Sequence, residues 1–146
     1  MRKAFVVSGW LLLVAFVLQF VFAAVGAFTK PAGDSGNALH SVNGMAVIPV
    51  LTLLTTLFAA LAKAPGRLIG LAILPLGLVV LQALLAALAN AFTDASGAST
   101  PVSLTIGGLH AINGIIAVHV VVNVLRGARA LARPGAPARE PVSEPA

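Results

Sequence analysis

The sequence predicts an all-α membrane protein: a four-transmembrane-helix bundle built from two tandem helix-hairpin repeats. Of the 146 residues, 59% are hydrophobic and only 9% are charged. Soluble domains are about one quarter charged because their surfaces face water. In addition, four stretches of 24 or 25 residues contain no Asp, Glu, Lys or Arg: 4–28, 38–62, 68–92 and 102–125. This composition argues against a water-soluble enzyme.

Each stretch is long enough to form one membrane-spanning helix, because about 20 residues cross the hydrocarbon core. A helix is expected because lipid offers no partner to an unpaired backbone N–H or C=O group. Pro49 and Pro75 lie inside the second and third stretches, where proline usually kinks a transmembrane helix. We therefore expect a transmembrane domain over residues 1–126. Residues 127–146, rich in Pro, Ala and Arg, are expected to form a flexible cytoplasmic tail.

The basic residues predict the orientation of the helices. Lys30 alone follows the first helix, whereas the other Lys and Arg residues precede helix one, join helices two and three, or follow helix four. Because cytoplasmic loops collect Lys and Arg, both termini are expected in the cytoplasm, in a multi-pass protein of the bacterial cytoplasmic membrane. A cleaved signal peptide ending near Ala27 is the alternative for the first stretch. Its apolar run is about twice the usual signal length, which favours an uncleaved helix.

The net charge of +5 does not indicate nucleic-acid binding. Aromatic residues make up 5% of the chain and Tyr is absent, so platforms on which bases stack are not expected. The four predicted helices also contain no carboxylate. Proton-coupled transport and acid–base hydrolysis inside the membrane are therefore disfavoured. We predict no catalytic residues, and the sequence leaves open whether the chain is an enzyme.

A short pattern, L-H-x-x-N-G, occurs twice, at residues 39–44 and 109–114. Each copy follows an A-F-T sequence that closes the preceding helix and a Leu-Gln pair within it, at Gln19 and Gln82. The second and fourth helices run in the same direction, so the two hairpins are expected to be related by an axis along the membrane normal. His40 and His110 would then lie on opposite sides of this axis, in the outer half of the membrane.

These residues form the candidate site, because a histidine inside a membrane faces the bundle interior by default. We predict that one b-type haem lies between two axial imidazoles. Nearby glycines would let the macrocycle approach the backbone, and Asn and Gln would bond the imidazoles or propionates. Zinc fits less well, since two histidines leave its shell incomplete. The predicted metal ligands are His40 and His110, and the other cofactor-binding residues are Asn43, Asn113, Gly44, Gly114, Gln19 and Gln82.

Two functions remain open. One is electron transfer or haem handling by a b-type haem protein. The other is a non-enzymatic membrane subunit or scaffold, because His, Asn, Gln and Gly also pack transmembrane helices together. The expected partners are the lipid bilayer and either a membrane redox partner or a second copy of the chain.

His119 lies nine residues after His110 and therefore on the opposite side of the same helix. Asn123 follows one turn later on the face of His119. The corresponding position of the first repeat is Pro49. We interpret the pair as structural, with a contact between protomers or with a quinone left open.

The L-Q pair of the third helix and the L-H motifs of the second and fourth resemble a small bacterial family of uncharacterised four-helix membrane proteins. Residues 4–125 more distantly resemble one four-helix half of heme A synthase. That resemblance implies haem-ligating histidines at His40 and His110. The synthase has a catalytic Glu three residues before a His, whereas Asn37 and Gly107 stand there in this chain. The resemblance therefore implies haem binding without hydroxylase chemistry.

Overall fold

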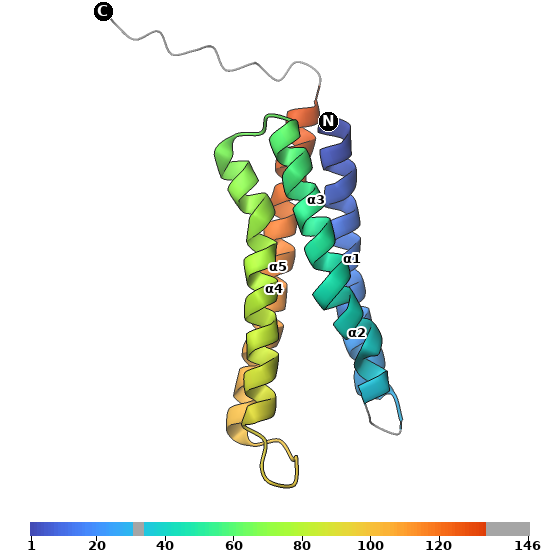
Figure 1. The fold of residues 1–146 in the computed structure, drawn as a ribbon, viewed down its shortest axis with the longest axis vertical. Helices are drawn as coiled ribbons and strands as arrows, with labels where there is room; N and C mark the ends of the chain where they lie inside the picture. The colour runs from blue at the N-terminus through green and yellow to red at the C-terminus, as the bar shows by residue number, and fades with distance from the viewer. Residues whose placement is uncertain (31–33, 134–146) are drawn as a thin grey trace, which may run out of the picture.

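The computed structural model describes residues 1–30 and 34–133. These residues form two antiparallel hairpins, with α1 beside α2 and α3, and α4 beside α5 (Figure 1). In chain order the elements are α1 (Arg2–Phe28), the 3-10 helix η1 (Asp34–Asn37), α2 (Ala38–Val42), the π-helix η2 (Asn43–Val47), α3 (Ile48–Leu61), α4 (Gly66–Ala91) and α5 (Pro101–Ala132).

Four helical spans of the described residues are long and apolar enough to cross a membrane: Arg2–Phe28, Ala38–Leu61, Gly66–Ala91 and Pro101–Ala132. Only 17–28% of the residues in their most apolar windows are buried. Most apolar side chains therefore point outward, which a water-soluble bundle avoids. The all-helical prediction is confirmed, and the chain is compatible with a multi-pass membrane protein.

The second span is not the continuous α-helix that the sequence predicts. Pro49 has no N–H group, so an α-helix would leave the carbonyl of Met45 without its usual donor. The structure widens the turn just before this proline, and the N–H of Ile48 donates to the carbonyl of Asn43. One-turn π-bulges of this kind are frequent at functional sites. Here the wide turn contains Asn43 and Gly44 of the candidate site.

Helix α5 continues to Ala132, beyond the predicted end at Leu125. The added residues are mainly Ala and Arg, which favour helix, and Ala128 is fully buried. The helix ends at Arg133, whose backbone is extended. Pro134 follows in the sequence, and a proline disfavours the helical conformation of the residue before it. Residues 127–132 of the predicted tail are therefore helical, and residues 134–146 lie outside the described part of the chain.

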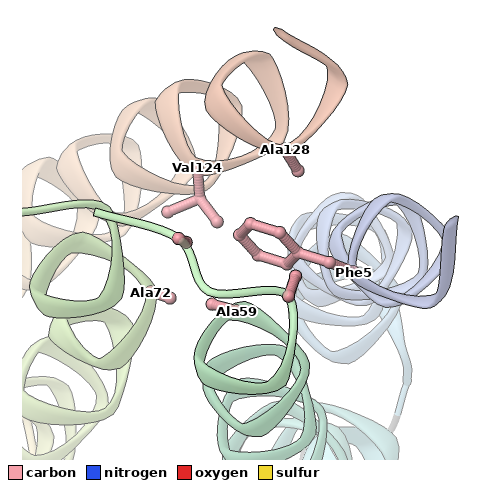
Figure 2. Packing of buried hydrophobic residues seen from close by; sticks show 7 residues of the cluster. Phe5, Ala59, Ala72, Val124 and Ala128 are labelled. Atoms are coloured by element: carbon pink, nitrogen blue, oxygen red, sulfur yellow. The ribbon is translucent and has the colours of Figure 1, made fainter. Parts of the chain in front are cut away.

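The hydrophobic core occupies the half of the bundle in which the chain begins. Phe5 packs against Val124 and small alanines contributed by the other helices (Figure 2). A second cluster contains Leu12, Ala15, Phe16, Ile48, Ala117 and Val121. Every buried apolar residue of α1 lies within Phe5–Phe16. The hairpins therefore pack together in this half and diverge toward the end that carries the α1–η1 and α4–α5 connections (Figure 1).

Basic residues gather at the packed end. The beginning of α1, the connection from α3 to α4 and the end of α5 all lie there (Figure 1). Among the described residues they are Arg2, Lys3, Lys63, Arg67, Arg126, Arg129 and Arg133, whereas Lys30 follows α1 at the opposite end. The guanidinium of Arg129 lies 6.0 Å from the ring centre of Trp10. This separation of charge is the one from which the cytoplasmic orientation was predicted.

At the opposite end, Asp94 organises the connection from α4 to α5. Its carboxylate accepts hydrogen bonds from the Ser96 hydroxyl (2.6 Å) and from the N–H groups of Ser96 (2.8 Å) and Ala98 (2.9 Å). These hydrogen bonds lower the pKa of Asp94 from its ordinary value, and the bond from the Ser96 hydroxyl has the largest effect. Because the folded pKa is the lower one, this contribution to stability is present above the ordinary pKa. It is lost as the pH falls through the lowered value.

The end of α3 gives a first prediction. Lys63 adopts the left-handed conformation, with φ 56°. Its N–H donates to the carbonyl of Ala60, and the N–H of Ala64 donates to that of Ala59. This is the Schellman pattern, in which glycine is usual at the left-handed position. Lys63→Gly should raise the free energy of unfolding by about 0.5–1 kcal/mol, because it removes left-handed strain. The measurement is unfolding in detergent followed by circular dichroism.

The matched control for this variant is Lys63→Ala. It removes the same charge but keeps a Cβ atom at the left-handed position, so it should give no stabilisation. An equal gain from both variants would attribute the effect to charge and contradict the prediction.

Candidate functional site

In the first hairpin, Gln19 joins α1 to the opposing helix. Its Nε2 atom donates to the carbonyl of His40 (3.0 Å), and its Oε1 atom accepts from Asn43 Nδ2 (2.7 Å). Asn43 also donates to the carbonyl of Ala15 (2.9 Å), one turn before Gln19. The Nδ1 atom of His40 lies 3.1 Å from the carbonyl oxygen of Gln19. These bonds fix the two antiparallel helices at one relative depth.

The second hairpin contains the same four hydrogen bonds. Gln82 Nε2 donates to the carbonyl of His110 (2.8 Å), and Gln82 Oε1 accepts from Asn113 Nδ2 (2.5 Å). Asn113 also donates to the carbonyl of Leu78 (2.9 Å), and His110 Nδ1 lies 3.1 Å from the carbonyl oxygen of Gln82. Each predicted Gln–His–Asn set is therefore brought together within its own hairpin. The asparagines bond glutamine and backbone rather than the imidazoles.

The carbonyl contacts fix the tautomers of both histidines. A carbonyl oxygen can only accept, so Nδ1 of each ring carries a hydrogen. His40 Nε2 lies 3.2 Å from Gln19 Nε2, which donates to it. His110 Nε2 has no hydrogen-bond partner among the described residues. In the neutral form of each ring, Nε2 is then the atom that can bind a metal.

The two imidazoles lie near each other although they belong to different hairpins. Their ring centres are 6.3 Å apart, and their planes are inclined at 41°. Two metal–nitrogen bonds of about 2 Å, with about 1.1 Å from each nitrogen to its ring centre, place two imidazoles on one metal at about 6 Å. The observed ring-centre distance is therefore compatible with two ligands on one ion, and it also falls within the range of two rings in ordinary contact.

The number of protein ligands also bears on the choice of metal. No three His, Cys, Asp or Glu side chains in the described ranges come close enough to share an ion. Two imidazoles suit the axial positions of haem iron, whose other ligands are the porphyrin nitrogens. The same pair leaves a zinc shell incomplete.

A cleft of about 260 Å³ lies beside the histidines and between the hairpins. Ligand clefts of about 300–1,000 Å³ are common, and they are mostly apolar with few polar groups. The volume of this cleft is slightly below that range, but its lining is likewise mostly apolar with a few polar groups. Its lining comes from all four spans: Phe16, Gln19, Phe20, Ala23, His40, Ser41, Gly44, Met45, Ile48, Leu78, Val79, Gln82, Ala83, Ala86, His110, Ala111, Asn113, Gly114 and Ala117.

The two motif glycines line the cleft and also make room for glutamine. A Cβ atom on Gly44 would lie 2.7 Å from Gln19 Nε2. On Gly114 it would lie 3.4 Å from Gln82 Nε2 and 3.5 Å from Cζ of Phe20. The sequence predicts that these glycines let a macrocycle approach the backbone. In the structure, Gly44 is required first by the amide of Gln19.

The third histidine lies outside the cleft, as its position on the helix predicts. His119 is exposed, and its Nδ1–H donates to the carbonyl of Ile115 (3.0 Å) on its own helix. Asn123 is also exposed. Sequence reasoning did not find the backbone acceptors Ala15 and Leu78. Their position four residues before each glutamine was the available signal.

A family model matches residues 19–90. The family is described as a family of unknown function (DUF6220). The matched segment includes Gln19, His40 and Gln82 but ends before His110. No curated protein and no solved structure matches the chain. The prediction of an uncharacterised family thus agrees with a family of unknown function, while the resemblance to heme A synthase gains no support.

The glycines give a second prediction. Gly44→Ala should lower the free energy of unfolding in detergent by about 1–3 kcal/mol, because its methyl group displaces the Gln19 amide from its bonds. Gly114→Ala should cost less, since its neighbours can yield by a few tenths of an ångström. Denaturant titration of the two variants measures the difference.

A double variant controls for the cause. In Gly44→Ala with Gln19→Ala, the overlap is removed, so the cost should fall below the sum of the two single costs. Additive costs, or equal costs for Gly44→Ala and Gly114→Ala, would show that glutamine packing does not explain the glycines.

Proposed function

We propose that this chain is a multi-pass protein of the bacterial cytoplasmic membrane that binds one b-type haem between His40 and His110. Its role would be electron transfer or haem handling. The observation that carries the proposal is the 6.3 Å spacing of the two imidazole ring centres across the hairpins. Identical Nδ1–H tautomers support it, because they leave Nε2 of each ring as the metal-binding atom.

Two tandem hairpin repeats, each supplying one axial ligand, would explain the duplicated motif. The four matching hydrogen bonds, from Gln19 and from Gln82, support this reading. The two hairpins run in the same direction along the chain, so a two-fold axis along the membrane normal would relate them. Such an axis would pass between the histidines and through the metal.

The residues of the site would orient the ligands and exclude water. The carbonyls of Gln19 and Gln82 hold the Nδ1–H groups, which fixes both rings and makes Nε2 more basic. His40 would exchange its bond from Gln19 Nε2 for a bond to iron. Gln19 would keep its bond to the carbonyl of His40.

Haem would supply one-electron chemistry when bound. With both axial positions taken by protein, the iron would have no open position for a substrate. Electron transfer or haem carriage therefore fits this donor set better than catalysis.

The charges at the packed end support an orientation with this end in the cytoplasm. With this end in the cytoplasm, both termini would be cytoplasmic, and the cleft would lie in the outer half of the membrane. A haem there could exchange electrons with a partner in or outside the membrane.

The second candidate is a non-enzymatic membrane subunit or scaffold. One observation favours it: the Gln19 amide already donates to His40 Nε2, so the first hairpin is complete without a ligand. In that case the hydrogen bonds would serve only to hold each helix pair together.

A reduced-minus-oxidised spectrum of the detergent-purified chain, expressed with ample haem, separates the two functions. We expect a b-type band in the unaltered protein and its loss in His40→Ala and in His110→Ala, because each removes one axial ligand. His119→Ala is the matched control and should keep the band, since His119 lies outside the cleft.

Circular dichroism of the same samples verifies that each variant remains helical. If the unaltered protein shows no band under these conditions, the haem proposal is wrong and the scaffold function is favoured. A band that survives both ligand substitutions would place the haem elsewhere.

A further inference from the structure

One face of α5 is exposed from the α4–α5 connection to the packed end. Its residues follow one another at spacings of three or four: Thr105, Gly108, Ile112, Ile115, His119, Asn123 and Arg126. All are exposed, and a Cβ atom on Gly108 would meet nothing within 4 Å. We call this set the α5 face. Within the described residues, no other element covers it.

The α5 face contains two polar side chains, His119 and Asn123, within the last predicted transmembrane stretch. His119 precedes Arg126 by seven residues, which places it about 10 Å along the helix from that charge. Polar and ionisable residues within a membrane normally face protein or a water-filled cavity. His119 and Asn123 instead face outward from this chain, where a second protein surface would give them partners.

The hydrogen-bonding groups of this pair are complementary to those of an identical copy. His119 donates its Nδ1–H to the carbonyl of Ile115, so its Nε2 atom is left as an acceptor. Asn123 makes no side-chain hydrogen bond to the described residues, and its amide offers two donors. Each copy thus brings one acceptor and one donor, one helical turn apart.

We propose that the α5 face forms a parallel interface with a second copy of this chain. In it, Asn123 of each copy donates to His119 Nε2 of the other. A two-fold axis along the membrane normal places equal residues at equal depth, so one symmetric contact forms both bonds. A different partner would need its own donor and acceptor at these depths. The proposal is independent of haem binding.

Packing on the α5 face favours the same arrangement. Gly108 and Thr105 are small, which lets two helices approach closely. From Thr105 to His119 the spacings alternate between three and four residues, which matches the left-handed crossing of paired helices. Arg126 lies at the membrane edge, where water and salt screen the repulsion between the two copies.

Disulfide cross-linking in lipid vesicles tests the interface, because the chain contains no cysteine of its own. Ile112→Cys places one thiol on the α5 face. Val80→Cys is the matched control: it is 56% exposed and lies two residues before Gln82, whereas Ile112 lies two after His110. Since Gln82 bonds His110 between antiparallel helices, positions 80 and 112 lie at similar depth.

Mild oxidation at a low protein-to-lipid ratio should give a covalent dimer with Ile112→Cys and little with Val80→Cys. Equal cross-linking of both variants would indicate random collision and overturn the proposal. A monomer in both cases would overturn it as well.

A second measurement tests the hydrogen bonds. His119→Leu or Asn123→Leu removes two bonds from each dimer, and each bond in a membrane contributes modestly. The dissociation constant of the dimer, measured by energy transfer as the amount of vesicle lipid is increased, should therefore rise about tenfold in either variant. Val80→Leu should leave it unchanged. Dissociation that is unaffected by both α5 substitutions would overturn the proposed pairing.

Discussion

Lipid supplies no hydrogen bonds, and this constraint gives the glutamine amide its central place in each hairpin. Gln19 donates to a backbone carbonyl of the opposing helix and accepts from Asn43, so both ends of its amide are satisfied. The amide must lie close to that helix, which requires glycine at position 44. This contact between the glutamine amide and the opposing helix sets both the relative depth and the relative rotation of the paired helices. The position of each imidazole is therefore a consequence of the glutamine.

The two hairpins agree inside the bundle and differ outside it. Helix α5 continues unbroken through His119, whereas the corresponding part of the first hairpin contains the π-helix η2 followed by Pro49. The π-helix is a local response to a missing N–H group, and it leaves the hydrogen bonds of Asn43 intact. The unbroken α5 carries His119 outward instead. The interior pattern thus serves contacts within the chain, while the outer face of α5 is free for a different contact.

The four spans were predictable from the sequence, since an apolar run of about 25 residues without charge is long enough to cross the hydrocarbon core as a helix. The grouping of Gln, His and Asn was predictable from their helical spacing. Their actual bonds were not, because donation to Ala15 and Leu78 depends on how two helices are rotated against each other. The extent of α5 was also missed, because burial of Ala128 near Phe5 is a tertiary contact. The local sequence pattern encodes neither the rotation of the helices nor this tertiary contact.

The hydrogen bonds within each hairpin do not by themselves explain why the site contains two neighbouring imidazoles. The glutamines bond the backbone carbonyls of His40 and His110, which any residue at those positions would provide. The imidazole of His40 adds two bonds to α1, and that of His110 adds one bond to α4. Neither contact requires the two rings, on separate hairpins, to lie 6.3 Å apart. A metal ion shared between two Nε2 atoms would require a spacing of this size, and this distance between the hairpins, rather than the bonds within them, is the ground on which we propose haem rather than a scaffold.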